Sequence, residues 1–200
     1  MDNQLGIKDY YFVRDVVEST SNVRIGMEQL LDYCKMKSPD PVWATIRNFE
    51  FEGEIPKLEL WLLNVLSSEP PSNDIKAFWF GLFNPILDNE TSCGFYICGS
   101  TNFASYDRTS DWACWQKDTY LPTQRYADSR ILREIYSLVD NNNNVSNFAE
   151  FILALGYTCL AVKYICRSIN PNLILGDRKR RDIAVGFDSG DSIILEGVER

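Results

Sequence analysis

The stretch "IKAFWFGLFNPIL", residues 75–87, decides the fold. Apolar and aromatic residues follow one another from Ile75 to Phe83 without the spacing of an amphipathic helix. The run is short and rich in aromatic residues, which favours a largely buried β-strand. The stretch "CGFYICGS", residues 93–100, predicts a second strand beyond the polar residues "NETS". With a third strand beginning at Trp112, we expect residues 75–120 to form a sheet.

Helical patterns lie on both sides of these strands. Residues 10–18 and 27–37 are amphipathic, although the first piece also suits a strand. A helix is predicted from Pro56 to just before Pro70, because its apolar residues follow helical spacing: Leu58, Trp61, Leu62, Val65 and Leu66. Another is predicted from Arg130 to Val139, where "NNNN" breaks it.

The last third of the chain predicts one more helix and a hairpin. Asn147 and Glu150 have the spacing of a capping box, so we expect a helix from Asn147 to about Arg167. The tail "IAVGFDSGDSIILEG" predicts two strands folded about Ser189 and Gly190, which extend the same sheet. The order helices, strands, helices, strands predicts an α+β fold with a single, mainly antiparallel sheet packed against several helices. We expect one domain over residues 1–200, with residues 1–70 as an optional helical N-terminal subdomain.

Composition and charge exclude several classes of function. A chain of 200 residues, 45% of them hydrophobic, buries a large core without needing a metal or a disulfide. The 28 acidic and 20 basic residues give a net charge of -8, which disfavours nucleic acid and suits a basic protein partner. The first residues lack the pattern of a secretory signal, and Glu150 and Lys163 interrupt the apolar segment 148–165. We therefore predict a cytoplasmic protein with no membrane contact.

The residues that catalysis and metal binding commonly require are mostly missing. The chain has no histidine, and its six cysteines form no closely spaced pair, so we predict no metal site, no cofactor and no catalytic residues. Cys159 and Cys166 are expected in the core. Glu52 and Glu54 are expected as surface charges, and "DRKRRD", residues 177–182, as a solvated loop.

A polar and aromatic stretch, "DWACWQKDTYLPTQRY" at residues 111–126, is the best candidate for a contact surface. A strand cannot bury all its large rings on one face, so we place Trp112 and Tyr120 in the core and Trp115 at the surface. Aromatic residues and arginine are enriched at protein interfaces. The predicted partner-binding residues are Asp107, Asp111, Trp115, Asp118, Arg125, Asp188 and Asp191.

Three stretches together resemble a known class of proteins: "GEIPKLELWLLNVLSSEPP" (53–71), "IKAFWFGLFN" with "CGFYICGSTNFASYDRTSDWACWQKDTYLPTQRY" (75–84 and 93–126), and "AVGFDSGDSIIL" (184–195). This combination resembles uncharacterised cytoplasmic bacterial proteins of the immunity-protein class of polymorphic toxin systems. The resemblance implies a protein that binds a cognate toxin and blocks its active site or an essential surface without doing chemistry. It carries over no catalytic residue.

Two other functions stay open at this point. One is a histidine-free enzyme that acts on a small substrate through Cys114 or through the pair Asp107 and Asp111. The other is a scaffold that associates with itself, for example as a homodimer, through a sheet edge.

Overall fold

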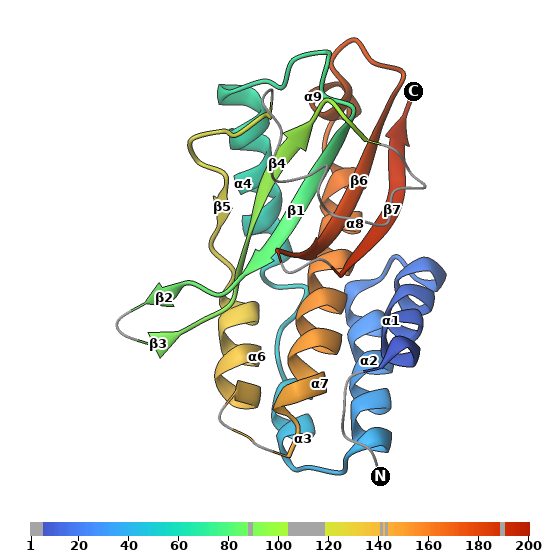
Figure 1. The fold of residues 1–200 in the computed structure, drawn as a ribbon, viewed down its shortest axis with the longest axis vertical. Helices are drawn as coiled ribbons and strands as arrows, with labels where there is room; N and C mark the ends of the chain where they lie inside the picture. The colour runs from blue at the N-terminus through green and yellow to red at the C-terminus, as the bar shows by residue number, and fades with distance from the viewer. Residues whose placement is uncertain (1–5, 88–89, 104–118, 141, 143, 189–190) are drawn as a thin grey trace.

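Five strands form the main sheet, in the order β5-β4-β1-β6-β7 (Figure 1). The computed structural model describes residues 6–87, 90–103, 119–140, 142, 144–188 and 191–200. The strands are β1 Ala77–Phe83, β4 Gly94–Ser100, β5 Tyr126–Ala127, β6 Arg180–Phe187 and β7 Ser192–Glu199. Only β1 and β6 run parallel, and the other neighbours are antiparallel. The predicted α+β fold with a mainly antiparallel sheet is confirmed.

Helices cover one face of this sheet and continue below it (Figure 1). Their bounds are α1 Ile7–Ser19, α2 Val23–Lys37, α3 Val42–Arg47, α4 Ile55–Ser68, α6 Arg130–Asp140, α7 Ser146–Glu150, the π-helix η1 Phe151–Leu155, α8 Gly156–Ser168 and α9 Pro171–Leu175. A small hairpin of β2 Ile86–Leu87 and β3 Glu90–Thr91 projects from the body. The helices of the first seventy residues and the inner face of the sheet share one hydrophobic core.

The two faces of the sheet differ because successive residues of a strand point to opposite sides. On β1, Phe78, Phe80 and Leu82 face the helices and join the main core. Ala77 and Trp79 face the other way and form a second, smaller cluster with Cys98 and Ala184. The strands predicted at 75–83 and 93–100 and the C-terminal hairpin are confirmed as β1, β4 and β6–β7. The strand predicted from Trp112 lies outside the described residues.

The long helix through α7, η1 and α8 is the centre of the core. Residues Phe148–Ser168 are apolar and long enough to cross a membrane, but 89% of their most apolar window is buried inside the fold. This burial fits the predicted core helix. The predicted cap at Asn147 is wrong, because the helix begins at Ser146 with Val145 in the capping position and no side-chain cap. Val145 is buried in the core, so packing rather than a capping side chain positions the first turn.

Glu54 is buried, which overturns its predicted place among surface charges, whereas Glu52 is exposed. The Glu54 carboxylate accepts hydrogen bonds from the hydroxyls of Ser129 (2.7 Å) and Tyr157 (2.8 Å). It also accepts from the backbone N–H groups of Arg130 and Ile131 at the start of α6. A carboxylate is favoured there because the first N–H groups of a helix lack partners within the helix.

Arg181 is also buried, so the prediction of a solvated loop over residues 177–182 is wrong at this position. Arg180 and Arg181 begin β6, and the Arg181 guanidinium donates to the carbonyl oxygens of Ile75 (3.0 Å), Ile174 (2.6 Å) and Ser72 (3.0 Å). Burial, with some repulsion from Arg178, lowers the pKa of Arg181 to about 10. The side chain joins β6 to α9 and to the segment before β1, which is a structural role.

Candidate binding surface

A row of residues on the outer face of the sheet begins with two paired glycines. Gly81 of β1 lies opposite Gly186 of β6 on one side and Tyr96 of β4 on the other. A Cβ atom at Gly81 would lie 2.5 Å from Cζ of the Tyr96 ring. Only glycine therefore leaves room for this ring to lie across β1. The Tyr96 hydroxyl then reaches beyond the glycine pair and donates a hydrogen bond of 2.8 Å to the carboxylate of Asp188.

Three rings meet at this end of the sheet, and we call Phe83, Tyr96 and Tyr126 the aromatic cluster. Their centroids lie 5.9 Å (Phe83 to Tyr96), 5.3 Å (Phe83 to Tyr126) and 6.0 Å (Tyr96 to Tyr126) apart. Such spacing and tilt are typical of favourable aromatic packing. Tyr126 nevertheless has 53% of its surface exposed. The cluster thus offers an ordered aromatic surface to solvent.

Arg125 covers one side of this cluster. Its guanidinium carbon lies 4.7 Å from the centroid of the Tyr126 ring, within the range of a cation–π contact. The guanidinium also donates to the Tyr126 hydroxyl (3.2 Å) and to the carbonyl oxygen of Pro122 (3.3 Å). Arg125 is therefore held in a defined position although it is partly exposed.

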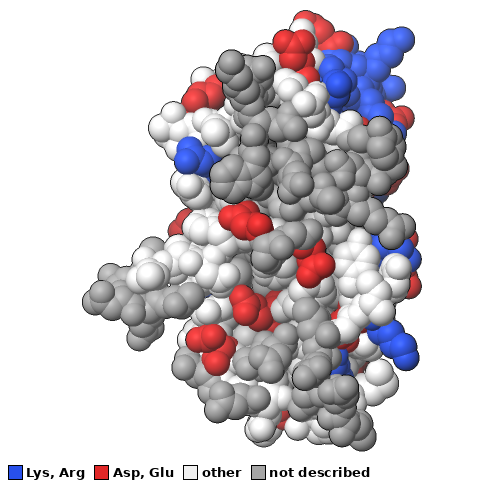
Figure 2. Space-filling model, viewed as in Figure 1, with Lys and Arg blue, Asp and Glu red and all other residues white. Residues whose placement is uncertain are grey.

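Carboxylates lie next to the cluster. Partial burial raises the pKa of Asp188, although the bond from Tyr96 acts in the opposite direction. Glu150 accepts a hydrogen bond of 3.1 Å from the side-chain amide of Asn84, which follows β1 directly. Burial, assisted by the negative charge of Asp140, raises the pKa of Glu150. Figure 2 shows acidic atoms along the middle of this face, while most of the visible basic atoms lie toward its upper right and right-hand margins.

Helix α7 is held beside the end of β6 by an aromatic contact. The ring of Phe151, the first residue of η1, stacks on that of Phe187 at 5.7 Å. Phe187 is the last residue of β6 and directly precedes Asp188. This contact places the Glu150 end of α7 and the Asp188 end of β6 at the same edge of the sheet.

The structure brings two of the predicted partner-binding residues together. Arg125 and Asp188 lie at opposite ends of the aromatic cluster, linked through Tyr126 and Tyr96. Asp191 is exposed at the start of the last hairpin strand, where its carbonyl oxygen accepts from the Phe187 N–H at 2.9 Å. Asp107, Asp111, Trp115 and Asp118 lie outside the described residues, as do Trp112 and Cys114. Tyr120 is partly buried and packs on the main core, close to its predicted place.

Phe83, Tyr96, Asn84 and Glu150 were not predicted as site residues. Tyr96 belongs to "CGFYICGS", which reads as a buried strand. Its alternation with buried Phe95 and Ile97 is the signal that was available, because a strand with one covered face turns every second side chain outward. The contact between Asn84 and Glu150 joins segments 66 residues apart, which no local pattern indicates.

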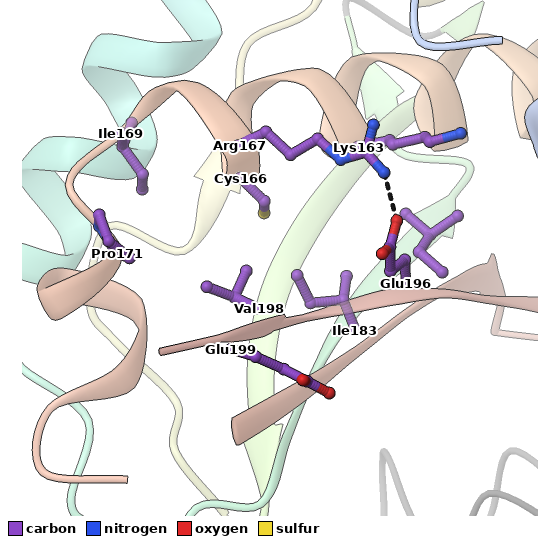
Figure 3. A pocket seen from close by; sticks show the side chains of 11 residues that line it. Lys163, Cys166, Arg167, Ile169, Pro171, Ile183, Glu196, Val198 and Glu199 are labelled. Carbon is purple, nitrogen blue, oxygen red and sulfur yellow. Dashed lines mark hydrogen bonds and ion pairs between the residues drawn. The ribbon is translucent and has the colours of Figure 1, made fainter. Parts of the chain in front are cut away.

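A groove of about 410 Å³ lies between α8 and β7 (Figure 3). The Arg167–Glu196 ion pair joins the helix to the strand across it. Its lining includes the apolar side chains of Ile183 and Val198 and the thiol of Cys166 beside charged residues such as Glu196 and Arg167. The strand pairing is irregular between Arg181 and Ile183, and such irregularities bend the strand away from its regular course.

Lys163 and Cys166 line the groove, but neither is available there as a base or a nucleophile. The Lys163 ammonium donates to the carbonyl oxygens of Val17 (2.5 Å), Thr20 (2.9 Å) and Glu18 (3.4 Å), which occupy its donors at the end of α1. Burial raises the pKa of Cys166 to about 12, so this thiol is protonated at neutral pH. Within the described part of the chain, no three or more Asp, Glu or Cys side chains are grouped so as to hold a metal ion.

Comparisons of the chain with protein-family models, curated proteins and solved structures give no match.

Proposed function

We propose that this chain is a cytoplasmic, non-enzymatic immunity protein that binds a cognate bacterial toxin and neutralises it stoichiometrically. The observation that supports this most directly is the aromatic cluster, exposed at Tyr126 and bounded by Arg125 and Asp188. Tyrosine and arginine are enriched among the residues that contribute most to protein–protein affinity. The resemblance to immunity proteins suggests the kind of partner.

The order of the cluster supports a role in binding. Tyr96 is fixed by Asp188, and Arg125 is fixed on Tyr126 and Pro122. Side chains that are already held in one conformation lose little entropy when a partner binds. A surface of this kind suits a protein whose task is tight association rather than turnover.

The direct test uses the product of the gene beside the one that encodes this chain. We expect the two purified proteins to form a one-to-one complex by calorimetry, and co-expression to rescue growth of cells that produce the toxin. Tyr126→Ala should weaken the complex by about 2 kcal/mol, close to thirtyfold in Kd. Tyr164→Ala is the matched control, because Tyr164 is 45% exposed on α8, away from the cluster. A neighbouring toxin that neither binds nor is neutralised would refute the proposal.

A second substitution separates binding from the enzymatic alternative. If the chain acts through the thiol of Cys114, Cys114→Ser abolishes the rescue of growth. If it acts by binding, the isosteric serine leaves rescue intact. The described cysteines are buried, so fast labelling of the native protein by a bulky thiol reagent reports on Cys114 alone.

A further inference from the structure

The carboxylates around the aromatic cluster are not neutralised by any cation in the described part of the chain. Asp188 is bonded to the Tyr96 hydroxyl and Glu150 to the Asn84 amide. Both of these donors are neutral. Elsewhere Asp9, Asp128, Glu196 and other carboxylates form ion pairs with lysine or arginine, and those pairs include neither Asp188 nor Glu150.

We infer that the partner places an arginine side chain on the aromatic cluster, with its guanidinium between the exposed ring face and the carboxylate of Asp188. This inference rests on the proposed function and names the chemistry of the partner at the same surface. The occupant is a basic, arginine-bearing segment of the toxin.

Charge and ring chemistry together favour arginine. A planar guanidinium stacks on an aromatic face and at the same time donates paired hydrogen bonds to a carboxylate, which the ammonium of lysine does not do. Arg125, 4.7 Å from the Tyr126 centroid, is an example of such stacking within the chain itself. A carboxylate that has only a neutral donor gains more from a cation than a carboxylate already paired with lysine or arginine.

The position of Glu150 extends the negative surface past the end of β1. The backbone N–H of Asp188 bonds to the carbonyl of Leu82 (3.2 Å), and Asn84, two residues later, bonds to Glu150. The two carboxylates therefore flank the last residues of β1. The projecting hairpin begins directly beyond Asn84 and bounds the surface on that side (Figure 1). A second copy of this chain is a poor occupant, because each copy carries a net charge of -8.

The first experiment titrates the protein with octa-arginine, octa-lysine or octa-glutamate peptides at low salt and monitors binding by NMR. We expect octa-arginine to shift the backbone signals of residues 81–84, 96, 126 and 188 most, octa-lysine less and octa-glutamate not at all. Asp188→Asn should weaken the binding of octa-arginine about fivefold or more, while the amide oxygen of the asparagine still accepts a hydrogen bond from Tyr96. Asp15→Asn makes the same change of charge on α1, where Asp15 is already paired with Arg14, and should have little effect.

The second experiment repeats these variants with the neighbouring toxin. Weaker toxin binding by Asp188→Asn and by the double variant Asp188→Asn, Glu150→Gln, but not by Asp15→Asn, supports the inference. If the toxin binds all variants equally, or if octa-arginine shifts spread evenly over the acidic surface, the inference is wrong while the proposed function stands. If the neighbouring toxin does not bind at all, the proposed function is wrong, and the inference that rests on it is wrong as well. A dimer in sedimentation that Asp188→Asn dissociates would assign the surface to a second copy and overturn the inference.

Discussion

The hydroxyl of Tyr96 on β4 donates a 2.8 Å hydrogen bond to Asp188 at the end of β6, although β1 lies between the two strands. The bond exists because β1 carries Gly81 at the crossing point, where a side chain would collide with the ring. A glycine in one strand thus determines the position of a tyrosine and a carboxylate in two others. Together these residues form the centre of the proposed contact surface.

Removal of this hydroxyl should change the titration of Asp188. The bond from Tyr96 lowers the pKa of Asp188 against the effect of partial burial, so Tyr96→Phe should raise that pKa further. A raised folded-state pKa favours the protonated folded form, so the variant should be less stable at neutral pH. Because the Asp188 carboxylate is exposed and screened by solvent, this loss of stability should be small, about 0.5 kcal/mol, and it should disappear as pH falls through the folded-state pKa. The Asp188 carboxyl carbon, followed by NMR, reports the pKa. Tyr126→Phe removes a hydroxyl without touching Asp188 and should leave it unchanged.

The glycine pair should tolerate no side chain. At Gly81 a Cβ would lie 2.5 Å from both the Tyr96 ring and Nε1 of Trp79, and at Gly186 it would lie 2.5 Å from the Trp79 ring. We expect Gly81→Ala and Gly186→Ala each to lower the free energy of unfolding by about 1–3 kcal/mol in urea titrations. Gly94→Ala is the control, because its nearest neighbour would lie at an ordinary 3.4 Å. Equal losses in all three variants would contradict this account.

Much of the fold was predictable because most of its elements have a local pattern of apolar residues. The strands in the apolar runs 75–83 and 93–100, the helix after Pro56 and the two C-terminal strands β6 and β7 all follow from such local patterns. The parallel pairing of β1 with β6 was not predicted. It joins residues about a hundred positions apart, and its register depends on the helices that intervene. Nor does local pattern predict that η1 winds as a π-helix.

The candidate surface was predicted only in part, for the same physical reason. Arg125 and Asp188 are polar residues beside turns, so their exposure follows from chemistry and position. That they lie at the two ends of one cluster depends on the register of β5, β4, β1 and β6. Arg181 shows the converse error. Within "DRKRRD" the sequence does not distinguish Arg181 from the neighbouring basic residues. Its burial is explained by the carbonyl groups of Ser72, Ile75 and Ile174, which accept its hydrogen bonds.

Glu54 should be a stabilising residue rather than a catalytic one. Glu54→Gln places an amide where hydroxyls and N–H groups all donate, so one oxygen acceptor is lost and some donors lose their partner. We expect a loss of about 1–3 kcal/mol in the free energy of unfolding, together with faster amide exchange at Ile131. Glu52→Gln is the matched control on an exposed position and should change stability by about 0.5 kcal/mol or less. An equal loss in the free energy of unfolding for the two variants would show that the buried Glu54 carboxylate stabilises the fold no more than an exposed one.

Asp9 should make the stability depend on acid pH. Burial alone would raise its pKa, but hydrogen bonds from Lys37 (2.7 Å), the Gly6 N–H (2.7 Å) and Tyr33 (3.0 Å) outweigh burial and lower the pKa below its ordinary 3.8. The unfolded chain therefore binds the proton more tightly than the folded one. The contribution of Asp9 is complete above the unfolded value and is lost as pH falls through the folded value.

Asp9→Asn tests this dependence directly. The variant should be less stable than the parent protein at pH 7, by about 1–3 kcal/mol, because the ionised partner of Lys37 is gone. The difference should narrow as pH falls below about 4, where the parent protein also loses the charge. Urea unfolding at a series of pH values measures both. Asp15→Asn, at an exposed position on the same helix, should differ little in stability from the parent protein at every pH. If the stability difference for Asp9→Asn stays constant with pH, packing rather than charge accounts for its effect.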